Sequence, residues 1–246
     1  MLKRYYYDLH LHSCLSPCGD IDNTPQNIVG MASLSALDII ALTDHNTAKN
    51  CPAFFDAAKR FGIIPVAGME LTTSEDIHVV CLFEHLTDAL RFDEYVASRR
   101  VLIKNRPEFF GEQLIIDADE QVVGTEEFLL TNATDISVDE IYDIARSYGG
   151  VAYPAHIDKD ANSITAILGT VPEDAKFDFF ELHSQESVDK TSALYGIDKS
   201  KFIISSDAHY LTDMRDKESF FLLDAADSTP DAIRRALFEY LRGNIG

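Results

Sequence analysis

Short apolar runs that alternate with amphipathic segments set the strongest limit on how this chain of 246 residues can fold. Several runs are continuously apolar, as strands covered on both faces are. The predicted strands cover residues 6–10, 38–42, 63–67, 78–83, 150–153, 178–182 and 202–205. Because a helical pattern follows most of them, the order predicts an α/β barrel of parallel strands.

Capping signals support the predicted helices. Thr24 and Thr229 each precede a proline, which is typical of a helix start, and Ser137 with Glu140 forms a capping box. Helices are predicted at 26–34, 52–61, 88–104, 138–148 and 231–241. The stretch 86–148 breaks the rhythm, with a helix followed by a hairpin of 113–116 and 127–130. It holds too few apolar residues for a core of its own, so we expect one domain, 1–246, with an insertion.

Charge and composition limit which kinds of partner and which location we expect. With 21 Lys and Arg against 41 Asp and Glu, the formal net charge is −20. Such a chain repels a phosphate polymer over most of its surface, so the sequence predicts no extended nucleic acid. No apolar run approaches the roughly 18 residues of a membrane span. The first residues lack the apolar core of a signal peptide, and four cysteines need no disulfide framework, so a cytoplasmic location is expected.

Histidines and acids gather where the predicted strands end. His10 and His12 lie two apart on a strand and so share a face, which suits a pair of metal ligands. The other candidates near strand termini are His45, Glu70, His78, His156, Asp207 and His209. Barrels build active sites at the carboxyl ends of their strands. Imidazole and carboxylate ligands suit Zn, Mn or Fe, and so many candidates predict two or three ions.

These motifs resemble the PHP family, the polymerase and histidinol phosphatase domain. The resemblance covers essentially the whole chain and rests on these segments: Asp8-Leu-His10-Leu-His12-Ser13, Leu42-Thr43-Asp44-His45-Asn46, Gly68-Met-Glu70, Ala155-His156 and Ser206-Asp207-Ala208-His209. It implies a distorted (β/α)7 barrel, a trinuclear metal centre and hydrolysis of phosphate esters by metal-bound hydroxide.

The resemblance also implies which residues hold which ion. His10, His12, Glu70 and Asp207 hold the first, Glu70 bridges to a second held by His78 and His156, and His45 and His209 hold the third. A further ligand follows the HxH pair in the family. We assign Asp20, with Cys18 as its rival, because this loop departs from the usual pattern.

Several residues have roles that stay open. Asp44 orients His45, handles protons or is a plain strand-end carboxylate. His183 contacts substrate, protonates the leaving group or supports the metal ligands from behind. Lys104, Arg106 and Lys159 lie in loops that could reach a phosphate. The remaining thiols, Cys14, Cys51 and Cys81, are expected to be buried.

The predicted function is therefore a metal-dependent phosphatase acting on a small phosphorylated substrate, such as a nucleotide, a sugar phosphate or histidinol phosphate. One alternative is an amidohydrolase-like metal hydrolase, which also uses an HxH strand in a barrel. Another is a non-catalytic metal-binding or regulatory PHP module. The sequence gives no information on oligomeric state.

Overall fold

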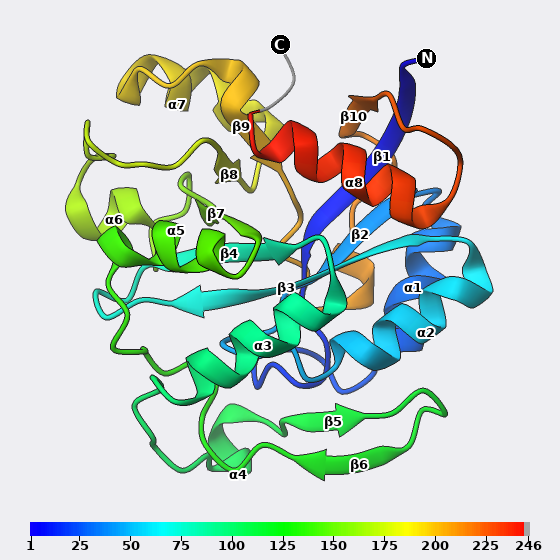
Figure 1. Ribbon diagram of the computed structural model, residues 1–246. Helices are drawn as coiled ribbons and strands as arrows, with labels where there is room; N and C mark the ends of the chain where they lie inside the picture. The colour runs from blue at the N-terminus through cyan, green and yellow to red at the C-terminus, as the bar shows by residue number, and fades with distance from the viewer. Residues whose placement is uncertain (244–246) are drawn as a thin grey trace.

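The computed structural model describes residues 1–243, with a curled mixed sheet at its centre (Figure 1). Its strands are β1 (Lys3–Leu11), β2 (Ile39–Leu42), β3 (Ile64–Thr72), β4 (His78–Phe83), β5 (Leu114–Ile116), β6 (Val122–Thr125), β7 (Gly150–Pro154), β8 (Phe180–Leu182), β9 (Phe202–Ile204) and β10 (Phe220–Leu223). Its α-helices are α1 (Pro25–Leu34), α2 (Cys51–Phe61), α3 (Leu86–Ala97), α4 (Pro107–Phe110), α5 (Val138–Ser147), α6 (Ile164–Leu168), α7 (Val188–Tyr195) and α8 (Pro230–Leu241).

The main sheet has the strand order β10-β1-β2-β3-β4-β7, and β8 and β9 form a separate parallel pair. A parallel bridge between Leu11 and Ala208 joins the segment after β9 to the end of β1. The backbone N–H of Ile204 also donates to the Tyr7 hydroxyl at 3.2 Å. The two sheets therefore curl into a half-barrel, and the end of β1 lies beside the segment that follows β9.

Strand direction differs from the prediction of seven parallel strands. β1, β2 and β3 are parallel, but β4 runs antiparallel to both β3 and β7. The cause is the short connection from Thr72 to His78, which folds back as a hairpin and leaves no room for a crossover helix. His78, at the start of β4, consequently lies at the same edge as the strand ends.

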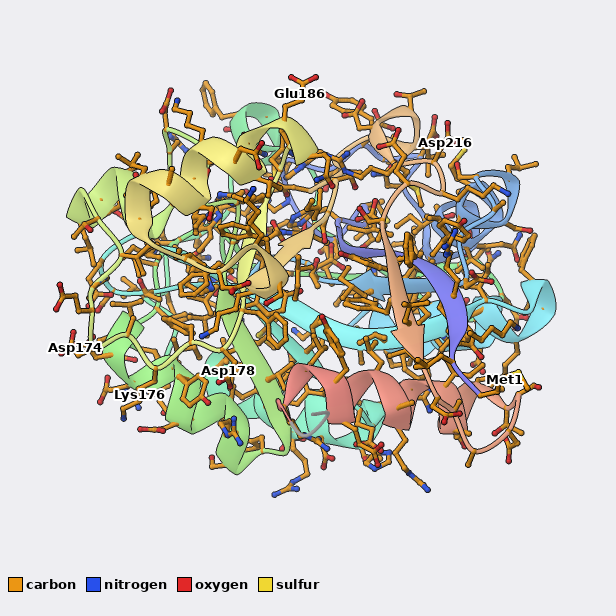
Figure 2. The ribbon with its side chains drawn as sticks, turned by 90° about the horizontal axis from the view of Figure 1, so that it is seen from above. Met1, Asp174, Lys176, Asp178, Glu186 and Asp216 are labelled. Carbon is orange, nitrogen blue, oxygen red and sulfur yellow. The ribbon has the colours of Figure 1, made fainter. Side chains whose placement is uncertain are left out.

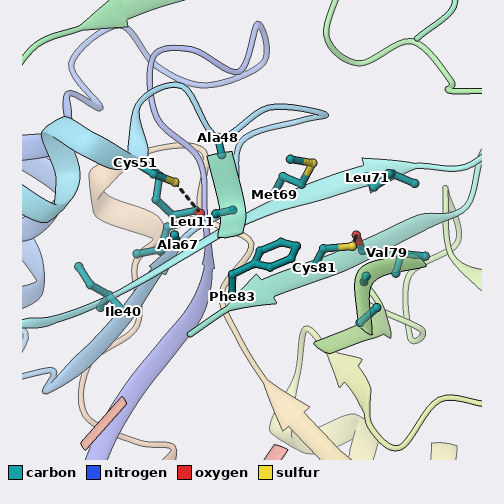
Figure 3. Close-up of a cluster of buried hydrophobic side chains, with 14 of the residues drawn as sticks. Leu11, Ile40, Ala48, Cys51, Ala67, Met69, Leu71, Val79, Cys81 and Phe83 are labelled. Carbon is teal, nitrogen blue, oxygen red and sulfur yellow. Dashed lines mark hydrogen bonds between the residues drawn. The ribbon is translucent and has the colours of Figure 1, made fainter. Parts of the chain in front are cut away.

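Two clusters of buried side chains cover the two faces of the sheet. One, partly drawn in Figure 3, packs residues such as Leu42, Met69 and Phe83 against α1, α2 and α3. The other packs strand residues against α8. Simple alternation puts Leu9 and Leu11 on one face, but they fall in different clusters. The pairing register of β1 shifts between Asp8 and Leu11, which turns the end of the strand.

Between β4 and β7, the stretch predicted as an insertion, the helix and the hairpin have other boundaries than predicted. α3 ends at Ala97, and residues 100–104 pair instead with 128–134 as extended chain. β5 pairs with β6 at Val122–Thr125, closer in sequence than the predicted partner at 127–130. Figure 1 shows this hairpin below the main sheet. A Cβ on Gly111 would lie 2.3 Å from the Pro17 carbonyl oxygen, so the insertion packs tightly on the loop after His12.

Candidate metal centre

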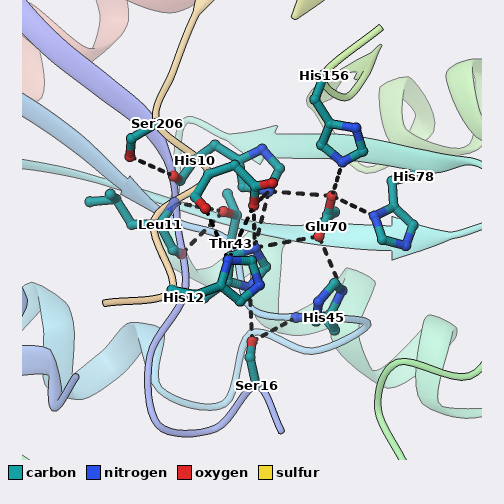
Figure 4. A network of polar contacts seen from close by, with 12 residues as sticks. His10, Leu11, His12, Ser16, Thr43, His45, Glu70, His78, His156 and Ser206 are labelled. Carbon is teal, nitrogen blue, oxygen red and sulfur yellow. Dashed lines mark hydrogen bonds and ion pairs between the residues drawn. The ribbon is translucent and has the colours of Figure 1, made fainter. Parts of the chain in front are cut away.

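Eight of the nine predicted ligands converge at the strand ends. Figure 4 labels His10, His12, His45, Glu70, His78 and His156 among them. Three overlapping groups hold ligand atoms within 4.8 Å of one another. They are His12, His45 and His209; His10, His12, Glu70 and Asp207; and His45, Glu70 and His78. His156 joins through its Nε2, which lies 3.1 Å from Glu70 Oε1. The strands thus bring together residues from every part of the sequence.

Glu70 lies at the centre of the cluster and is 1% exposed. Its Oε1 lies 2.8 Å from His78 Nδ1 and 3.4 Å from His10 Nε2. Its Oε2 lies 3.1 Å from His45 Nδ1 and 3.4 Å from His12 Nε2. Because the two oxygens face different imidazoles, this one carboxylate can bridge two ions.

Asp207 closes the cluster on another side. Its Oδ1 lies 3.1 Å from His12 Nε2 and 3.3 Å from His10 Nε2, and its Oδ2 accepts from Lys159 Nζ at 2.6 Å. The φ of Asp207 is 52° and that of His156 is 28°, both left-handed. Such strain persists only where surrounding contacts impose it, and it aims these two side chains inward.

The pKa values show how crowded the charges are. Burial alone raises the pKa of Glu70, but the surrounding imidazoles outweigh it and hold this pKa well below its usual range. Burial by itself lowers the pKa of His10, but the neighbouring carboxylates, Glu181 first, outweigh burial and raise this pKa well above its usual value. Hydrogen bonds to Asp207 and Glu70 similarly overcome burial and raise the pKa of His12 to about 9. Without metal, protons on these two rings balance the buried carboxylates.

For His45 and His209 the pKa is lowered instead of raised. Burial, despite the attraction of Glu70, holds the pKa of His45 well below its usual range. Burial and the charge of His12 lower the pKa of His209 to about 4. These two rings are therefore neutral near pH 7, the state in which imidazole binds a metal.

Two carboxylates behind the cluster orient its histidines. Glu181 accepts from His10 Nδ1 at 2.9 Å and from the backbone N–H of His156 at 3.2 Å. Asp44 accepts from the Ser16 hydroxyl at 2.7 Å, and Ser16 Oγ lies 2.9 Å from His12 Nδ1. Both contacts leave Nε2 free for metal, as carboxylate–histidine pairs at metal sites do.

The sequence missed Glu181 as a member of the site and gave Asp44 other roles. Glu181 stands in β8 between Phe180 and Leu182, and alternation along the strand puts its side chain on the face opposite to these two core residues, from which it reaches His10. Asp44 makes its hydrogen bonds with Ser13 and Ser16, so it acts on His12 through Ser16.

Asp20 lies outside the three groups found among residues 1–243. Its Oδ1 accepts from the backbone N–H of Asp22 at 2.8 Å. Cys18, its rival, is exposed and also lies outside these groups. Cys14, Cys51 and Cys81 are buried and free, as expected.

His183 also stands apart from the cluster, at the rim. Its backbone N–H donates to Asp158 at 2.7 Å. Burial, then Lys159 and Arg215, lower the pKa of its imidazole. The ring is therefore neutral at pH 7 and lines the entrance to the site.

The donor set fits metal ions. Glu70 Oε2, His45 Nδ1 and His156 Nδ1 are buried without a hydrogen-bond partner. Leaving such atoms unpaired costs about 1–3 kcal/mol each unless a ligand satisfies them. An ion between Glu70 and His45 would satisfy one atom of each. The combination of imidazole and carboxylate donors suits a divalent transition metal.

A curled α/β sheet with such a cluster at its strand ends is the framework of a metal-dependent hydrolase. The chain belongs to the PHP domain family, whose model matches residues 8–161. A 76-residue stretch is also 33% identical to an uncharacterized protein of Methanocaldococcus jannaschii. That match covers 28% of this chain and 44% of that protein.

Solved structures share the fold at low sequence identity. The lesion-specific endonuclease Q of Pyrococcus furiosus has a TM-score of 0.64 and 18% identity over 99% of this chain and 57% of that one. An amidohydrolase from Chromobacterium violaceum has a TM-score of 0.58 and 19% identity, over 98% and 97% of the two chains. A phosphoesterase from Bifidobacterium adolescentis has a TM-score of 0.54 and 17% identity, over 94% and 95%. The chain thus spans little more than half of the endonuclease.

One expectation about partners is wrong. The negative charge predicts no extended nucleic acid, and the resemblance predicts a small phosphorylated substrate. Endonuclease Q with the same fold binds a 27-mer DNA duplex that carries an abasic lesion, with a TM-score of 0.65 to this chain. Net charge does not decide the matter, because metal ions held by this cluster would reverse the local sign. As for membranes, none of the helices in residues 1–243 is both long and apolar enough to cross one.

Proposed function

We propose that the chain is a metal-dependent phosphoesterase that hydrolyses phosphate ester bonds of nucleic acid at the cluster centred on Glu70. The observation that carries the proposal is the central carboxylate, whose two oxygens face the imidazoles of His78, in β4, and His45, after β2, at 2.8 and 3.1 Å. Paired ions at such a site activate water and neutralise charge on the phosphate. We assign three sites for Zn, Mn or Fe, with the donor sets that the resemblance implies.

The chain's own residues hold this arrangement rigid. Glu181 fixes the ring of His10, and Asp44 fixes that of His12 through Ser16. Both His10 and His12 are fully buried, so their rings cannot swing towards solvent. Ligands fixed in this way keep the reacting groups in place without reorganisation.

Nucleic acid is proposed as the substrate because almost the whole chain shares its fold with part of an endonuclease that was solved with DNA bound. Parts of that endonuclease have no counterpart in this chain, so the groups that contact the strand must be found at the site itself. Lys159 and Arg215 at the rim supply cations for a strand, within an otherwise acidic molecule.

The test is a cleavage assay in Mn, Zn or Fe. Its substrates are a DNA duplex with an abasic site, an unmodified single strand and a panel of amides. We expect strand cleavage by the natural chain and none by Glu70→Gln, with Glu186→Gln, on the surface, as the matched control. Amide hydrolysis without strand cleavage would instead favour the amidohydrolase alternative.

A further inference from the structure

Beside the cluster, a cavity of about 530 Å³ opens between β8 and the segment after β9. Lys159, His183 and Arg215 line it, and Asp207 forms its boundary with the cluster. Exposed acids, Asp213, Asp216 and Glu218, form its outer lip. Figure 2 shows Asp216 at the edge of the molecule. The volume falls within the range of ordinary small-molecule sites.

Asp207 links the cavity to the cluster through its two oxygens. Oδ1 faces the rings of His10 and His12, while Oδ2 accepts from Lys159. Because different oxygens serve the two sides, a metal ligand bond at Oδ1 leaves the contact with Lys159 in place. Lysine has three N–H donors, and its side chain here is 34% exposed, so donors remain for a ligand in the cavity.

The backbone of Lys159 and the side chain of Arg215 are both held by hydrogen bonds. The Lys159 backbone N–H donates to the carbonyl of His156 at 2.8 Å, and its carbonyl accepts from Ser163 Oγ at 2.7 Å. Arg215 donates through Nη2 to the carbonyl of His183. Positions held this way need little ordering when a ligand arrives.

Arg215 also has donor capacity to spare. Its side chain is 18% exposed, and its Nε is buried without a partner. Its Nη1 lies 3.6 Å from Glu218 Oε2, too long for a strong bond. An anionic oxygen in the cavity would be attracted by this guanidinium and by Lys159 together.

From these contacts we propose that the cavity binds the nucleotide next to the one being hydrolysed. Its phosphate lies between Lys159 and Arg215, and its sugar and base present N–H and O–H donors to the acidic lip. The lining requires such a mixed ligand, since an anion alone would meet the carboxylates of the lip. The identity of the ligand rests on the proposed function, and the cavity itself does not.

The test compares thymidine trinucleotides whose phosphorothioate linkages resist hydrolysis. One trimer has both linkages charged, and the others have one linkage replaced by a neutral methylphosphonate, at either position. Calorimetry on the Mn-loaded protein should give about tenfold weaker binding when one charge is removed, the usual size of a charge-assisted contact.

Variants assign that difference to the cavity. Lys159→Met and Arg215→Met should reduce the tenfold difference to about twofold or less. Lys201→Met removes the same charge at the far end of β9 and should keep the full difference. Three results would overturn the subsite: equal binding of the doubly and singly charged trimers by the natural chain, absence of any binding, or an undiminished difference in both variants. Loss of strand cleavage with the charge difference intact would overturn only the proposed function.

Discussion

Replacing Glu181 by glutamine tests whether a buried carboxylate outside the ligand set controls metal affinity. Glu181 is fully buried, with its oxygens 2.9 and 3.0 Å from His10 Nδ1. Glutamine keeps the shape of the side chain, so packing is preserved. It removes the negative charge and replaces one acceptor with an NH2 group that cannot accept from the imidazole N–H.

The expected size follows from that contact. A hydrogen bond to a charged group contributes about 1.5–3 kcal/mol, and a factor of ten in affinity corresponds to about 1.4 kcal/mol. Changes to the groups that orient metal-bound histidines cost about 10–100-fold in affinity. We therefore expect Glu181→Gln to weaken binding of Zn or Mn by about 10–100-fold, since His10 loses its fixed orientation.

Competition with a fluorescent chelator measures this affinity directly. Glu186→Gln is the matched control, because it makes the same chemical change at a residue that lies at the edge of the molecule in Figure 2. Circular dichroism confirms that both variants fold. A metal affinity of Glu181→Gln within about twofold of the natural chain would refute the orienting role.

Three further results are expected. Ser16→Ala breaks the link between His12 Nδ1 and the carboxylate behind it, so metal affinity should fall about tenfold in the same competition assay; unchanged affinity would contradict the relay. In chelated protein the pKa of His12 is about 9, above its unfolded value of about 6.5. The resulting stability, about 3 kcal/mol, is complete below pH 6.5 and lost as pH rises through 9, so thermal unfolding should show a falling Tm there, and a constant Tm would contradict it. Gly68→Ala places a Cβ 2.5 Å from the Cys81 carbonyl oxygen and should destabilise by about 1–3 kcal/mol in urea, whereas Gly124→Ala, with 3.6 Å of space, should not.

The sequence was sufficient for most of the cluster because strand ends are local features. A short apolar run followed by His or Asp places that side chain at an edge, and the edge gathers Glu70, His78 and Asp207 whatever the details of pairing. The placement of His78 at this edge is correct even though β4 runs in the opposite direction to the predicted one. His78 stands at the start of that strand, so the hairpin returns it to the same edge.

Contacts between distant residues could not be read from the sequence. Glu181 reaches His10 across 171 positions, and Asp44 reaches His12 only through Ser16. Asp20 is assigned from the resemblance alone and stays a prediction, and in the structure its Oδ1 accepts from the backbone N–H of Asp22. Net charge is a poor guide to nucleic-acid binding, because it averages over the whole surface, whereas binding depends on local groups such as Lys159 and Arg215, which line one cavity together with acidic side chains.

The central claim is that the cluster around Glu70 holds several metal ions. Elemental analysis of protein purified without chelators measures this directly, with Glu70→Gln alongside. We expect two or three Zn, Mn or Fe ions per natural chain and fewer in the variant, because Glu70 bridges two of the proposed sites. A folded natural chain that holds no transition metal, even after incubation with these ions, would contradict the account.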